Sequence, residues 1–70
     1  MKVLIRSKSN GLYLAEREDH HEEWVNPIGE AHDFGGAVNA IAFVVAHYLR
    51  DIELVHAFPD AQYNFSLPLS

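Results

Sequence analysis

Residues 37–49, with the sequence AVNAIAFVVAHYL, constrain the fold of this chain more than any other segment. Eleven of these thirteen residues are apolar, and only Asn39 and His47 are polar. A surface helix is normally polar over about half of its circumference, whereas a helix of this composition has apolar side chains on every side. A small domain covers one side of such a helix, and an apolar stripe that stays exposed usually marks an interaction site. The sequence therefore predicts self-association or a protein partner.

The composition indicates a single small domain, residues 1–70, that needs additional stabilisation. A domain of this size buries only about 60% of the surface of its unfolded chain. The sequence contains no cysteine, so neither a disulfide nor a cysteine-ligated metal can stabilise it. Association is the remaining route. We therefore expect a homodimer or a complex with a small protein partner.

Charge and hydropathy argue against two classes of partner. Ten acidic residues against five basic ones give a net charge of −5, whereas contacts to phosphates need clustered lysine and arginine. A basic strip of Lys2, Arg6 and Lys8, with Tyr13 across from it, carries too few aromatic rings for an RNA platform. No segment approaches the roughly 20 apolar residues of a membrane span. We expect a cytoplasmic protein that binds neither nucleic acid nor a membrane.

Four segments have the alternating pattern of strands. Residues 1–7 and 12–15 flank Asn10-Gly11, a strong hairpin signal because both residues tolerate positive φ. Residues 52–58 and 63–69 flank a turn at Pro59-Asp60, and Pro68 predicts that the last strand is an edge. Residues 16–30 are polar and acidic and are expected to form a loop, with Trp24 closing the end of the core.

This order predicts an α+β fold of the form ββαββ. Two β-hairpins are joined by one helix, and a four-stranded, mainly antiparallel sheet carries the helix on one face. We expect the first strand to lie between the second and third, and Asp33 to cap the helix N-terminus. The predicted core combines the matching strand and helix faces: Val3, Ile5, Leu12, Leu14, Ile41, Val44, Val45, Tyr48, Leu54 and Phe65.

The opposite side of the predicted helix holds the candidate interface. Asn39, Phe43 and His47 recur every four residues there, with the small residues Ala42 and Ala46 beside them. An aromatic ring flanked by hydrogen-bonding side chains is typical of an interface centre. The sequence thus predicts that a two-fold dimer forms around Phe43.

The remaining polar clusters have simpler interpretations than chemistry. His20, His21, Glu22 and Glu23 have metal-binding side chains, but neighbouring side chains in an extended segment point apart and a structural site needs four placed ligands. His32 beside Asp33 has no nucleophile or oxyanion donor nearby. Gly35-Gly36 lacks the lysine of a phosphate loop. We expect no catalytic residue, no metal site and no cofactor.

Several motifs resemble those of small uncharacterised bacterial proteins. They are Gly11-Leu12-Tyr13-Leu14, Trp24, Ala31-His32-Asp33-Phe34 before an alanine-rich helix, and Ile52-Glu53-Leu54-Val55 after it. This resemblance covers most of the chain and implies no activity. The hairpin and helix are also distantly similar to HicB-type antitoxins, which implies a degraded double-stranded-RNA-binding-like fold and a toxin partner. The chain lacks the Leu-Pro-Gly-Cys-like strand of that family.

Two functions remain open at the level of the sequence. The apolar helix favours a small non-enzymatic protein–protein interaction module that self-associates. The alternative is a His/carboxylate metal-binding or small-ligand-binding protein, because five histidines accompany many carboxylates.

Overall fold

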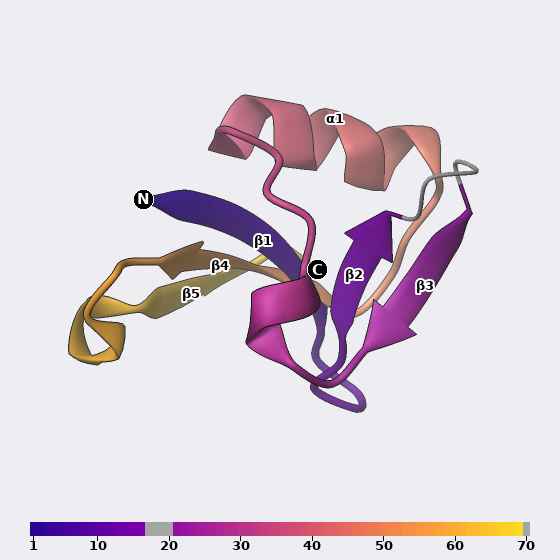
Figure 1. The fold of residues 1–70 in the computed structure, drawn as a ribbon. Helices are drawn as coiled ribbons and strands as arrows, with labels where there is room; N and C mark the ends of the chain where they lie inside the picture. Colours follow the sequence, from indigo (N-terminus) through magenta and orange to yellow (C-terminus); the bar gives the residue numbers. More distant parts are fainter. Residues whose placement is uncertain (17–20, 70) are drawn as a thin grey trace.

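A computed structural model describes residues 1–16 and 21–69 and shows one sheet with one α-helix packed on it (Figure 1). In chain order the elements are β1 (Lys2–Ser7), β2 (Tyr13–Glu16), β3 (Glu22–Val25), the 3₁₀ turn η1 (Ile28–Glu30), α1 (Ala37–Ala46), β4 (Ile52–Ala57), the 3₁₀ turn η2 (Ala61–Tyr63) and β5 (Phe65–Pro68). The predicted α+β class is confirmed.

The sheet has five strands in the order β3-β2-β1-β4-β5, and every neighbouring pair is antiparallel. The predicted order of four strands is therefore correct, but the predicted number is wrong. The additional strand is β3, which lies in the segment expected to be a loop. Its acidic residues Glu22 and Glu23 hid it, because strands are normally recognised by apolar alternation. Trp24 pairs with Leu14 near this edge of the sheet instead of closing the core.

The first hairpin turns where the sequence predicts. Gly11 has φ +72°, and the amide of Ser7 donates to the carbonyl of Leu12 at 2.8 Å. The amide of Leu12 also donates to Oδ1 of Asn10 at 3.0 Å. A positive φ favours glycine, which explains why Asn-Gly stands at this turn.

The segment between η1 and α1 passes from one face of the sheet to the other, through the space between β1 and β2 (Figure 1). These strands pair at Arg6 and Tyr13. Further along, the carbonyl of Leu14 accepts from the amide of His32, and the carbonyl of Val3 accepts from the amide of Phe34, both at 2.9 Å. Residues 32–34 therefore satisfy backbone groups that the diverging strands leave unpaired. We call residues 31–34 the crossing segment.

Asp33 anchors the crossing segment and does not cap the helix as expected. Its Oδ1 accepts from the amide of Gly35 at 2.9 Å and from the amide of Val3 at 3.1 Å. These two bonds, that of Gly35 first, lower the pKa of the Asp33 carboxyl from its ordinary value. The N-cap of α1 is Gly36, without a side-chain bond. Asp33 thus ties the start of β1 to the loop before the helix.

Each face of the sheet has its own apolar cluster. Under α1 lie Val3, Ile5, Leu14, Ala40, Val44, Ile52 and Leu54, with Phe34, Ala37, Phe43 and Leu49 packed at their margin. On the other face lie Leu4, Val55 and Ala57, with Tyr13 and Ala31 beside them. Ala31 and Phe34 belong to different clusters, which confirms that the crossing segment passes through the sheet.

The helix ends at Ala46, earlier than the predicted Leu49, in a Schellman motif. The amide of Leu49 donates to the carbonyl of Val44 at 3.1 Å, and that of Tyr48 to the carbonyl of Val45 at 3.3 Å. Tyr48 occupies the left-handed position of this motif with φ +54°. Glycine is the usual residue there, because a side chain in this conformation is strained.

The helix faces the sheet with a different side from the one predicted. Ala40 and Val44 are buried and Phe43 is half-buried, whereas Ile41, Val45 and Tyr48 are exposed. Of the predicted core, Leu12 is half-buried and Phe65 is exposed as well. The five residues of that set that are buried are Val3, Ile5, Leu14, Val44 and Leu54.

In the described part of the chain, no helix is long and apolar enough to cross a membrane.

Candidate interaction surface

The three residues predicted to form the interface lie on the flank of α1 that faces β2 and β3. Phe43 stacks on His47 with ring centroids 4.0 Å apart and contacts Phe34 at 5.1 Å. Nδ1 of His47 lies 3.3 Å from Oε1 of Glu22 on β3. Asn39 is exposed and donates through Nδ2 to the carbonyl of Phe34 at 3.1 Å. These side chains are therefore engaged within the fold, and Phe43 packs at the margin of the core.

The crossing segment supplies the cover for this flank. His32 meets Phe34 edge-on at 4.6 Å, and Phe34 leads on to Phe43 and His47. His32 also lies 3.5 Å from a carboxylate oxygen of Glu16. Four rings thus form one row from the crossing segment to the end of the helix. We call this side of α1 the covered flank.

The opposite flank of α1 carries an exposed apolar stripe. Val38, Ile41, Val45 and Tyr48 recur at helical spacing, and between 41% and 88% of each residue is exposed. Helical spacing of this kind is what the sequence shows. The prediction that this stripe faces the sheet is wrong, because a helix that is apolar all round gives no signal for which stripe faces the sheet.

Strand β5 carries a second set of exposed apolar residues. Phe65 and Leu67 pair with His56 and Leu54, so they share the face of the sheet on which α1 lies. Phe65, Leu67 and the adjoining Leu69 are each between 37% and 50% exposed. The covered flank faces β3 at one edge of the sheet, so the stripe on α1 faces the other edge, which is β5.

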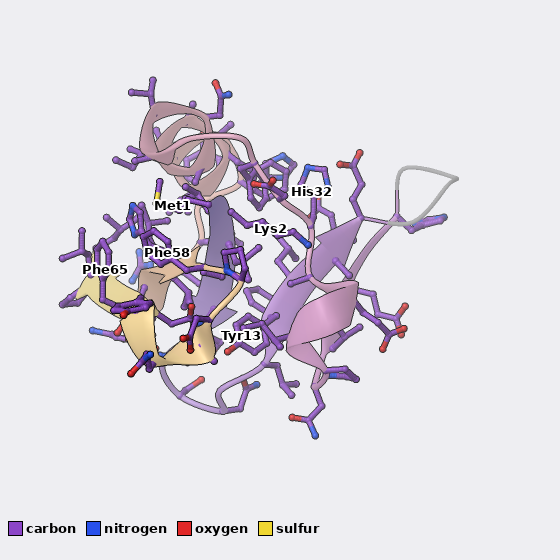
Figure 2. The ribbon with its side chains drawn as sticks, turned by 60° about the vertical axis from the view of Figure 1, so that its left-hand side comes forward. Met1, Lys2, Tyr13, His32, Phe58 and Phe65 are labelled. Carbon is purple, nitrogen blue, oxygen red and sulfur yellow. The ribbon has the colours of Figure 1, made fainter. Side chains whose placement is uncertain are left out.

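We call these seven residues the outer surface: Val38, Ile41, Val45, Tyr48, Phe65, Leu67 and Leu69. The surface has a firm base, because Phe65 stacks on the buried ring of His56 at 4.5 Å and lies 6.2 Å from Phe58. Figure 2 shows Phe58 and Phe65 together near Met1, away from His32 on the covered flank. None of the seven residues is charged, although the chain carries a net charge of −5.

The free edge of β5 offers few backbone groups for strand pairing. The amide of Leu69 donates to Ile52 of β4 at 2.9 Å, so alternation directs the backbone groups of Leu67 inward and those of Ser66 and Pro68 outward. Proline has no amide hydrogen. The predicted edge position of Pro68 is confirmed, and association along this edge must use side chains more than backbone bonds.

The candidate metal and catalytic residues do not come together in the described residues. No group of three or more His, Asp or Glu side chains there is placed to hold a metal ion. His20 of the candidate metal cluster lies outside the described residues. Asp33 accepts hydrogen bonds from two backbone amides, those of Val3 and Gly35. Arg6 of the basic strip is paired with Glu53 and donates to the hydroxyl of Tyr13 at 3.3 Å.

The comparisons with known proteins find no family model, no curated protein and no solved structure that matches this chain. The resemblance to HicB-type antitoxins stays a prediction. The functional argument therefore rests on the outer surface and on the chemistry of the residues around it.

Proposed function

We propose that this chain is a small non-enzymatic interaction module that self-associates through the outer surface. The observation that carries the proposal is that α1 and β5 both carry exposed apolar residues on the same face of the sheet, and every one of these residues is more than a third exposed. Burying apolar area contributes about 25 cal/mol per Å². A small domain buries a smaller share of its surface on its own than a large domain does, so a partner that covers the outer surface would add to its stability.

The backbone conformation and exposure of Tyr48 are independent evidence that the outer surface is an interface. Its backbone is left-handed at φ +54°, where glycine is preferred, and 88% of the residue is exposed. A tyrosine at this position costs stability and contributes little packing within the chain. Strained residues are commonly retained at functional sites, and tyrosine is enriched at interfaces because it combines an apolar ring with a hydroxyl.

A second copy of the chain fits the charge distribution. Two copies each carry a net charge of −5 and repel one another over most of their surfaces. The outer surface has no charge, so it is the region where two copies meet with the least repulsion. A two-fold contact brings the same patch together from both subunits. We place its centre at Val45, on the opposite flank from Phe43.

The test compares two glutamate substitutions at neighbouring helix positions. Val45→Glu puts an unpaired charge into the proposed contact and should give a folded monomer. Ala46→Glu is the matched control, because Ala46 is also exposed and both positions lie in the last turn of the helix. Sedimentation equilibrium at high micromolar concentration measures the association, and circular dichroism checks the fold.

The expected result is a dimer for the wild type and for Ala46→Glu, and a monomer for Val45→Glu. A monomeric wild-type protein contradicts self-association. Equal dissociation by both variants, or by neither, places any contact away from the outer surface.

A further inference from the structure

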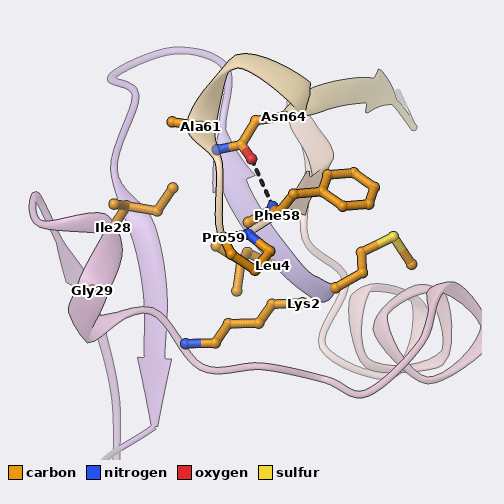
Figure 3. Close-up of a pocket in the computed structure, with 10 residues that line it drawn as sticks. Lys2, Leu4, Ile28, Gly29, Phe58, Pro59, Ala61 and Asn64 are labelled. Carbon is orange, nitrogen blue, oxygen red and sulfur yellow. Dashed lines mark hydrogen bonds between the residues drawn. The ribbon is translucent and has the colours of Figure 1, made fainter.

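A pocket of about 510 Å³ lies on the face of the sheet opposite α1 (Figure 3). Its floor includes Leu4 of β1 and Ala57 of β4. Ile28 and Gly29 of η1 form one wall, and Pro59 and Ala61 from the connection between β4 and β5 form the other. The volume is in the range of small-molecule sites, which are typically about 300 to 1,000 Å³ and mostly apolar.

Two polar side chains that supply hydrogen-bond donors, those of Lys2 and Asn64, line the pocket. Lys2 is the charged residue among them, and Figure 3 shows its side chain extended toward the η1 side of the pocket. Oδ1 of Asn64 accepts from the amide of Phe58 at 2.7 Å. This bond fixes the orientation of the amide group, because only the oxygen can accept, and leaves its NH₂ as a donor.

Two carboxylates near the pocket accept hydrogen bonds from other groups. Asp60 accepts from the backbone amide and the side-chain amide of Gln62, at 3.2 and 2.7 Å. Asp33, whose charge acts on Lys2, accepts from the amides of Val3 and Gly35. The lining itself has no acidic residue among the described ones. In a chain with twice as many acidic as basic residues, an apolar pocket that carries a lysine is distinctive.

We propose that this pocket binds a small amphipathic carboxylate. The apolar part of the ligand lies over Leu4 and Ala57, and its carboxylate accepts from the Nζ of Lys2. A charge-assisted bond at the end of an apolar site orients such a ligand and distinguishes it from a neutral one. The pocket and the outer surface lie on opposite faces of the sheet, so this proposal does not depend on self-association.

The probe is sodium octanoate, titrated into ¹⁵N-labelled protein and followed by amide chemical shifts. We expect saturable shifts at Leu4, Ala57 and Asn64. n-Octanol has the same apolar chain without the charge and should bind more weakly by roughly tenfold, because a hydrogen bond to a charged group contributes about 1.5 kcal/mol or more.

Three variants assign the binding to the pocket. Lys2→Gln should weaken octanoate binding by roughly tenfold and leave octanol binding unchanged. Lys8→Gln is the matched control, because it removes an exposed lysine at the far end of β1. Gly29→Leu should block both probes, since a Cβ at Gly29 meets no atom within 4 Å and the new side chain can fill the pocket without displacing its neighbours.

Three results would overturn the proposal. One is octanoate binding that Lys2→Gln does not weaken. Another is equal affinity for octanol and octanoate, which removes the role of the charge. The third is a set of shifts confined to α1 and β5, which would place the octanoate on the outer surface. Repeating the titration with Val45→Glu, which alters the outer surface and not the pocket, shows whether octanoate binds to the outer surface. This result is independent of whether the protein self-associates.

Discussion

The two flanks of α1 have different surroundings, and the more apolar flank is the exposed one. On the covered flank, Phe43 and His47 belong to a row of rings that the crossing segment completes. On the other flank, Val38, Ile41 and Val45 are at least as apolar and remain exposed. The difference teaches that the neighbours of a uniformly apolar helix, and not its own composition, decide which side becomes core.

Residue size explains which side faces the sheet. Ala37 and Ala40 lie against β1 and β4, where small side chains permit a close approach of the helix. Phe43 then projects toward the space between β1 and β2, where the crossing segment brings Phe34. If Ile41 and Val45 pointed inward instead, the helix would stand further from the sheet and Phe43 would lose its contacts.

The largest effect that tests this comparison is on stability. Phe43→Ala should lower the free energy of unfolding by about 2 kcal/mol, less than the 3 to 5 kcal/mol of a fully buried phenylalanine. Ile41→Ala, on the exposed flank, should cost less than about 1 kcal/mol. Urea denaturation at a concentration where the protein is monomeric measures both. A larger cost at Ile41 than at Phe43 would mean that the helix is rotated from the orientation described.

A smaller effect should have opposite signs for stability and for association. Tyr48→Gly relieves a left-handed tyrosine and should stabilise the monomer by up to about 1 kcal/mol. The same change removes an exposed aromatic ring from the outer surface and should weaken self-association. Thermal unfolding of dilute protein and sedimentation equilibrium give the two readings. A variant that is destabilised, or that associates as strongly as the wild type, contradicts the role given to Tyr48.

The smallest effect concerns the anchor of the covered flank. The pKa of Asp33 is lowered in the folded state, so its carboxylate contributes stability above the pKa of the unfolded chain, and that contribution is lost as the pH falls through the folded pKa. Asp33→Ala should therefore be less stable than the wild type at neutral pH, and the difference should shrink in acid. A difference that is independent of pH would show that the charge of Asp33 has no part in it.

Much of the sheet follows from the sequence. Asn10-Gly11 predicts the first hairpin because few residues tolerate positive φ, and Pro68 predicts an edge because it lacks an amide hydrogen. Strand β3 could not be found by alternation, since Glu22 and Glu23 pair with Glu16 and Ala15 near the edge of the sheet, where apolar side chains are not required.

The site was harder to predict than the fold. The sequence identifies the stripe that contains Ile41 and Val45. Whether this stripe is buried or exposed depends on the crossing segment, which reaches the helix only through a gap between strands. Tyr48 gave no signal either, because its left-handed backbone is a property of the helix end and not of the residue. Hydrophobic periodicity therefore locates the apolar faces of a helix, and tertiary contacts decide which of these faces is buried.

The long ladder between β1 and β4 has a consequence for how the molecule folds. Lys2 pairs with Ala57 and Ser7 with Ile52, so the central strand gains its second neighbour only when a loop of roughly 50 residues has closed. The crossing segment must also lie between β1 and β2 before the helix can dock. Domains dominated by such distant pairings fold in roughly milliseconds to seconds. The local hairpin at Asn10-Gly11 can form early, but the slow step is the meeting of the two ends of the sequence.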